Sequence, residues 1–148
     1  MMNTPIKNLM TREVVTICPN DLMIVAKEIF ETNKFHHIPV VDEDDQLVGI
    51  LSQHDYNKML TTFSVFKNSK ADLANRKFMM SMQVKDVMTD QVKKLHPDDS
   101  ILVAVGIFKE NLFHALPIID ANNRVVGILT TFDLLAYAYD EKKELNIK

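Results

Sequence analysis

The sequence contains two copies of one segment, and this internal repeat limits what the chain can fold into. Residues 6–60 align with residues 84–138 without a gap, and roughly 20 of about 55 aligned positions are identical. Such a duplication indicates two copies of one supersecondary unit. A unit of about 55–60 residues is marginal as an independent domain. We therefore expect the two copies to bury their sheets and helices against each other.

Each copy has the hydrophobic pattern of an amphipathic helix near its beginning. The apolar stripe of the first copy is Leu22, Val25, Ala26, Ile29 and Phe30. The corresponding positions of the second copy are Ser100, Val103, Ala104, Ile107 and Phe108. Asp21 and Asp99 each follow a proline closely and stand where an N-terminal cap belongs. These helices are therefore expected to begin at the two aspartates.

Short apolar runs after each helix predict a hairpin of two strands. The runs at residues 38–41 and 116–119 lack strict alternation, which is typical of a strand buried on both faces. Turns, second strands and short leading strands are predicted at residues 42–45, 47–51 and 14–17, and at residues 120–123, 125–129 and 92–95. A further helix is expected from about Asp55 and from about Asp133. The predicted fold class is α/β (α+β), with tandem β-α-β-β-α repeats.

The repeat divides the chain into three parts. Residues 1–61 hold the first copy, and residues 84–148 hold the second copy with a short polar tail. Residues 62–83 have no counterpart inside a repeat, and we expect a partly helical connector with a mobile middle. Its methionines are expected in the core or in a dimer contact rather than in a docking surface for another protein; they are Met79, Met80 and Met82.

Composition excludes several classes of function. The 148-residue chain has a net charge of −3, so no overall basic field favours nucleic acid. No apolar run approaches the roughly 18 residues of a membrane span, and residues 1–5 lack the regions of a secretory signal. Cys18 is the single cysteine, and the five histidines lack the spacing of a metal site. We expect a cytoplasmic protein that binds no metal.

Three motifs occur in both copies, and through them the chain resembles the cystathionine-β-synthase (CBS) domain family. They are Asp-Val-Met-Thr at residues 86–89 with a variant at 8–11, the proline motif at 38–42 and 116–120, and Gly-x-x-Ser/Thr-x-x-Asp at 49–55 and 127–133. The resemblance extends from Ile6 to about Tyr139. It implies a pseudo-two-fold module, a non-catalytic regulatory role, a homodimer formed through helices, and a separate effector protein.

The resemblance also implies two clefts that bind adenosine compounds such as AMP, ADP, ATP, S-adenosylmethionine or cyclic di-AMP. Each cleft combines the segment before the proline of one repeat with the Ser/Thr and Asp of the other. One cleft is expected to use Phe35, His36, His37 and Ile38 with Thr130 and Asp133. The other is expected to use Phe113, His114, Ala115 and Leu116 with Ser52 and Asp55.

The Ser/Thr-x-x-Asp motif also fits a helix capping box that needs no ligand. The two interpretations are compatible, because a helix N-terminus presents free N–H groups to an anion and a carboxylate accepts hydrogen bonds from a ribose diol. Phe35 and Phe113 fit either adenine stacking or core packing, while Ile38 and Leu116 are expected to shape an apolar slot.

The histidines before the proline motifs also have two interpretations. A histidine beside an apolar run commonly bonds a backbone carbonyl. In the gamma subunits of AMP-activated protein kinase, which the family includes, a His-Arg pair at this place reaches phosphate. His36-His37 resembles that pair with the arginine replaced, which predicts weaker and pH-dependent binding of polyphosphates. His114-Ala115 carries still less charge.

Three hypotheses for the function follow. The first is a module that senses an adenine nucleotide and signals to a partner protein. The second is a dimerising scaffold with empty clefts, and the third is nucleic-acid binding through a local surface, which the acidic balance disfavours. The sequence has no nucleophile elbow and no separated acid/base pair, so we expect no enzymatic activity.

Overall fold

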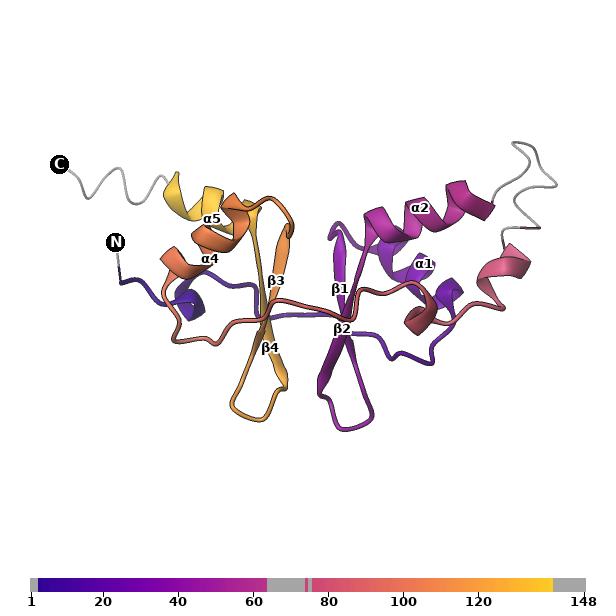
Figure 1. Ribbon diagram of the computed structural model, residues 1–148, viewed down its shortest axis with the longest axis horizontal. Coiled ribbons are helices and arrows are strands. Elements are labelled where there is room, and N and C mark those ends of the chain that lie inside the picture. The colour runs from indigo at the N-terminus through magenta and orange to yellow at the C-terminus, as the bar shows by residue number, and fades with distance from the viewer. Residues whose placement is uncertain (1–2, 64–73, 75, 140–148) are drawn as a thin grey trace. The chain divides into compact units, whose positions relative to one another are not determined.

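The computed structural model describes residues 3–63, 74 and 76–139 (Figure 1). The chain forms two compact units, one of Val15–Val92 and one of Met1–Val14 with Lys93–Lys148. Each unit contains one hairpin and the two helices of one repeat, so the mixed helix and strand class is confirmed.

In the unit Val15–Val92, a helix precedes an antiparallel hairpin and a second helix follows it. The elements are α1 (Met23–Thr32), β1 (His37–Val41), β2 (Leu47–Ser52), α2 (Gln53–Phe63) and the short 3-10 helix η2 (Val84–Asp86). Ile38 pairs with Leu51 near the open end of the hairpin. Figure 1 shows α1 and α2 on the same side of this hairpin. The strands are predicted correctly because the short apolar runs that mark them are largely buried.

The other unit repeats this order. Its elements are η1 (Ile6–Asn8), α4 (Ile101–Lys109), β3 (Ala115–Ile119), β4 (Val125–Thr130) and α5 (Thr131–Ala138). Leu116 pairs with Leu129, as Ile38 does with Leu51. The equal register shows that both copies fold by the same pattern.

The predicted leading strands are wrong in extent. Only Ile17 and Leu95 make a bridge, each of them parallel to the first strand of its hairpin at Val40 and Ile118. Ile17 donates to the Pro39 carbonyl at 3.1 Å and accepts from the Val41 amide at 2.9 Å. The chain turns directly after Ile17, where the Asp21 amide donates to the Cys18 carbonyl at 3.1 Å, so the bridge does not extend in that direction.

The Met-Thr motif of each copy packs against the hairpin of the other copy. Thr11 exchanges two backbone hydrogen bonds of 2.9 Å with Ile128, and Thr89 does the same with Ile50. The methionine before each threonine lies so close to a hairpin glycine that a side chain there would collide. An added Cβ on Gly127 or Gly49 would come within 2.7 Å of the Met10 or Met88 sulfur.

The aspartates expected to cap the first helices have another role. Leu22 and Ser100 occupy the cap positions of α1 and α4. The Asp21 carboxylate accepts from the Cys18 amide at 2.9 Å, and the Asp99 carboxylate accepts from the His96 amide at 2.8 Å. The cap prediction is wrong because each carboxylate reaches back to close the preceding turn. The hairpin turns are found as predicted, with Asp45 and Asn123 at φ near 60°.

The core of the unit Val15–Val92 includes part of the connector. Residues 74 and 76–79 are helical, as predicted, while the predicted mobile middle of the connector lies outside the described residues. Met79 is buried and accepts a hydrogen bond from the Tyr56 hydroxyl at 3.7 Å. Met82 is half-buried against the same cluster, whereas Met80 is exposed. Met79 is therefore a core residue, as its sequence context indicates.

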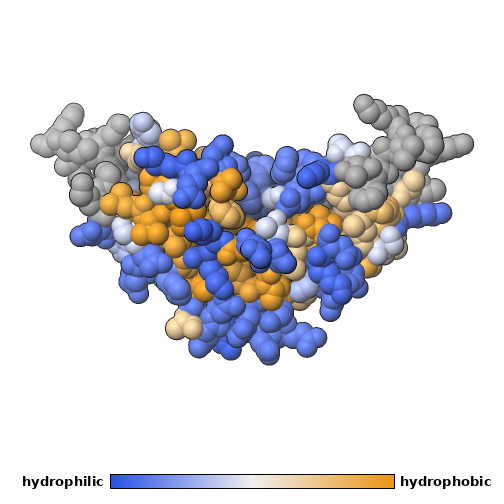
Figure 2. Space-filling model, in the orientation of Figure 1, coloured by the Kyte–Doolittle hydropathy of each residue, from blue (hydrophilic) through white to orange (hydrophobic). Residues whose placement is uncertain are grey.

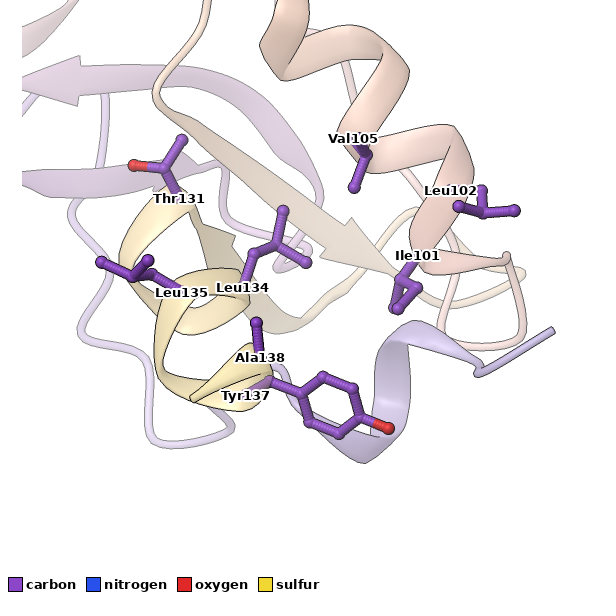
Figure 3. Close-up of a pocket in the computed structure, with 8 residues that line it drawn as sticks. All are labelled: Ile101, Leu102, Val105, Thr131, Leu134, Leu135, Tyr137 and Ala138. Atoms are coloured by element: carbon purple, nitrogen blue, oxygen red, sulfur yellow. The ribbon is translucent and has the colours of Figure 1, made fainter. Parts of the chain in front are cut away.

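The two helices of the second repeat leave an apolar groove of about 460 Å³ (Figure 3). Its lining comes from α4 and α5, and Ile101, Val105 and Leu134 point into the space between these helices. No residue of α5 is buried, although Leu134 and Tyr137 pack partly against the core. In the first repeat, Tyr56 at the position of Leu134 is buried under Met79.

Candidate ligand-binding site

The Ser/Thr-x-x-Asp motif forms a reciprocal cap at the start of each second helix. The Thr130 amide donates to the Asp133 carboxylate at 2.8 Å, and the Asp133 amide donates to the Thr130 hydroxyl oxygen at 3.2 Å. At α2, the Asp55 amide donates to the Ser52 hydroxyl oxygen at 2.9 Å, and the Ser52 amide to the Asp55 carboxylate at 3.4 Å. The capping interpretation is confirmed by this geometry.

The Asp133 carboxylate has a partner that the sequence did not indicate. Its Oδ1 atom accepts a hydrogen bond of 3.3 Å from the Thr11 hydroxyl, while Oδ2 serves the cap at Thr130. The backbone bridge between Thr11 and Ile128 positions this hydroxyl. Thr11 is therefore part of the site. The Met-Thr motif, which both copies contain, was the signal available in the sequence. Its contact with Asp133 arises only because the segment that leads the first copy packs on the hairpin of the second copy.

The segment before the first proline is tied to the start of α2. His36 Nδ1 lies 2.6 Å from Gln53 Oε1, and the Gln53 amide donates to the His36 carbonyl at 2.7 Å. His36 is exposed, His37 begins β1, and Phe35 is half-buried against the core. Gln53 was missed by sequence reasoning because it occupies a variable position of the motif.

The matching segment of the second repeat has fewer polar groups. His114 is exposed, Phe113 is half-buried, and Ala115 and Leu116 are buried. Leu116 and its counterpart Ile38 have no exposed surface, and their side chains belong to the cores of their own units. Only their backbone groups are thus placed to face a ligand.

Each compact unit assembles one half of the predicted residues. Val15–Val92 contains Phe35, His36, His37 and Ile38 with Ser52 and Asp55. The other unit contains Phe113, His114, Ala115 and Leu116 with Thr130 and Asp133. The pairing expected from the sequence joins residues of different units, and it stays a prediction.

Cys18 lacks the environment of an activated nucleophile. Slight desolvation raises the pKa of this exposed thiol, and the Asp21 carboxylate raises it further. A reactive thiolate requires a lowered pKa, usually from a nearby cation or a helix N-terminus. Cys18 therefore lacks the lowered pKa that marks an activated nucleophile.

In residues 3–63, 74 and 76–139, no group of three or more His, Cys, Asp or Glu side chains is arranged to hold a metal ion. Within the same ranges, none of the helices has the length and apolar character needed to cross a bilayer.

The CBS domain model matches residues 6–61 and 84–140. The chain belongs to the CBS-domain family. An uncharacterized protein of Methanocaldococcus jannaschii, MJ1426, is 31% identical over 88% of both chains. The inosine-5'-monophosphate dehydrogenase of the same organism is 32% identical over 84% of this chain but only 21% of its own length. This CBS protein thus matches an enzyme over a small part of that enzyme.

Solved structures of CBS pairs share the fold. The CBS domain pair of protein MJ0100, in complex with 5'-methylthioadenosine and S-adenosyl-L-methionine, is 28% identical, with a TM-score of 0.70 over 91% of this chain and 95% of that one. CBSX2 in complex with AMP is 22% identical, with a TM-score of 0.74 over 93% and 98% of the two chains. Both of these CBS pairs thus hold compounds that contain an adenosyl group.

Proposed function

We propose that this CBS pair is a non-catalytic regulatory module that binds an adenosyl ligand. The observation that carries the proposal is the duplicated cap at α2 and α5, with a half-buried carboxylate at Asp55 and Asp133. The adenosyl compounds bound by the MJ0100 pair and by CBSX2 support the ligand class. AMP, ADP, ATP, S-adenosylmethionine and cyclic di-AMP are the candidate ligands.

The proposed chemistry assigns a separate part of the ligand to each group. The carboxylate accepts two hydrogen bonds from the ribose diol, and the helix N-terminus with the Ser52 or Thr130 hydroxyl faces the anionic part. The segments Phe35 to Ile38 and Phe113 to Leu116 surround the base and the phosphate. Following the family pattern, each segment serves the carboxylate of the other repeat. Binding then changes the arrangement of the repeats, provided that the ligand has different affinities for two arrangements.

The proposal includes a homodimer formed through the α4–α5 face. Figure 2 shows apolar residues at the surface over these helices. Leu102 of α4 and Leu135 of α5 are 51% and 57% exposed and line the groove. Exposed apolar patches commonly mark protein interfaces. A second copy covers this face in our proposal, as Met79 covers Tyr56 in the first repeat. The module signals to a separate effector protein in the cytoplasm.

A thermal-shift screen followed by calorimetry tests the ligand. A ligand at roughly 100 times its dissociation constant adds about 2.7 kcal/mol to stability, which gives several degrees for a chain of this size. Asp133→Asn and Asp55→Asn are the informative variants, because asparagine keeps an acceptor for the cap but cannot accept both hydroxyls of a diol. Loss of binding with an unchanged melting temperature supports the proposal. Unchanged affinity in the double variant contradicts it.

The alternative function is a ligand-free dimerising scaffold. The observation that favours it is the completeness of the capping box, which explains Thr130 and Asp133 without a ligand. Protein shown to be free of nucleotide, and unshifted by every candidate ligand, would support the scaffold.

A further inference from the structure

Two hydrogen bonds connect the residue before β1 to the first residue of α2. The Gln53 amide donates to the His36 carbonyl at 2.7 Å, and the Gln53 side-chain oxygen lies 2.6 Å from His36 Nδ1. The adjacent pair His37 and Ser52 closes the hairpin register. The backbone bond thus sets the distance between the two residues, and the side-chain bond sets the orientation of the imidazole.

The side-chain contact also sets where the imidazole carries its proton. A side-chain amide oxygen only accepts hydrogen bonds, so His36 Nδ1 must be the protonated nitrogen in this contact. Nε2 is then the nitrogen available to a ligand. It accepts a hydrogen bond when the ring is neutral and donates one to an anionic oxygen when the ring is protonated.

The second repeat lacks this arrangement. His114 occupies the position of His36, and Thr131 occupies that of Gln53. In the part of the chain that the structure describes, the His114 imidazole has no hydrogen-bond partner. The Gln53 contact therefore constrains the His36 imidazole more than the His114 imidazole is constrained.

We propose that Gln53 is a positioning residue that holds His36 with Nδ1–H toward α2 and Nε2 toward the phosphate of a bound nucleotide. This inference rests on the proposed function and adds a preference of the site for ligands that carry a phosphate. A constrained donor loses less conformational entropy on binding than a mobile one. The histidine of the first repeat therefore favours AMP over adenosine more strongly than His114 does.

The first test measures the tautomer of His36 in the ligand-free protein by long-range proton–nitrogen NMR above the imidazole pKa. We expect the Nδ1–H form in the parent protein and a mixture of tautomers in Gln53→Ala. Thr131→Ala, at the matched position of the second repeat, should leave the His36 signal unchanged. An Nε2–H form in the parent, or no response to Gln53→Ala, would overturn the proposal.

The second test compares AMP with adenosine by calorimetry. Gln53→Ala should weaken AMP binding about fivefold and leave adenosine binding unchanged, since only the phosphate contact depends on His36. Gln53→Glu restores an acceptor for Nδ1–H and should recover most of the AMP affinity. Equal affinities for AMP in the parent and Gln53→Ala would refute the role of Gln53. A parent protein that binds neither these two compounds nor any of the other candidate ligands would instead overturn the proposed function, while the tautomer measurement still tests Gln53.

Discussion

Thr11 and Asp133 are 122 positions apart in the sequence, yet the Thr11 hydroxyl donates a hydrogen bond to Asp133 Oδ1 at 3.3 Å. The Met-Thr motif of the first copy thereby contacts the capping box of the second copy. The bond connects the oxygen of Asp133 that faces away from the cap to a second hydroxyl. A ribose diol at this position would therefore meet an Asp133 carboxylate that the Thr11 hydroxyl already orients.

Replacing Thr11 by valine removes this hydroxyl while keeping the shape of the side chain. Because Thr11 is exposed, we expect a loss of less than about 1 kcal/mol in the free energy of unfolding. Urea denaturation measures the change. Thr16→Val is the matched control at another exposed threonine, and its effect should be close to zero. Equal losses in both variants would show that the Thr11 hydroxyl contributes nothing specific.

Gly127→Ala should destabilise the chain because the new Cβ meets the Met10 sulfur at 2.7 Å and the Thr11 carbonyl at 3.0 Å. Overpacking of this kind costs about 1–3 kcal/mol. Gly106→Ala is the control, since it lies inside α4 with nothing within 4 Å of the added atom. It should stabilise the protein by up to about 1 kcal/mol through helix propensity. Thermal unfolding of the two variants should shift in opposite directions, and a shared direction would contradict this account.

Leu135→Asn tests the proposed dimer face. The first repeat has Asn57 at this position, so the change places a residue that the same fold already accepts. Leu135 is exposed in the single chain, and its replacement should lower dimer affinity about tenfold or more without destabilising the unit. Light scattering across a concentration series gives the oligomeric state. A monomeric parent protein, or a dimer insensitive to this variant, would exclude the α4–α5 face.

The reactivity of Cys18 should depend on pH in a defined direction. Slight desolvation and the Asp21 carboxylate raise the pKa of the exposed thiol, so the thiol stays protonated to a higher pH than in an unfolded peptide. The rate of alkylation by iodoacetamide should therefore continue to rise above the pH at which a cysteine peptide levels off. Asp21→Asn should move the curve toward lower pH. An alkylation rate that levels off at a lower pH than that of the peptide would contradict the raised pKa.

The sequence by itself determined the repeating pattern of elements. The apolar runs around Ile38 and Leu116 predicted buried strands correctly, because a strand covered on both faces leaves no position for polar residues. The capping box was also readable, since Thr130 and Asp133 are three residues apart and their hydrogen bonds depend only on local geometry. The family followed from motifs that recur at one offset.

The tertiary structure decided every contact between segments distant in the sequence. Hydrophobic periodicity does not predict that Thr11 packs on the second hairpin. This contact depends on which hairpin the segment before each first helix packs against. Periodicity also does not predict that Asp21 closes a turn instead of capping a helix, because both roles satisfy a backbone amide with the same carboxylate. The contact of His36 with Gln53 likewise needs the hairpin register, which brings two residues 17 positions apart within 2.6 Å.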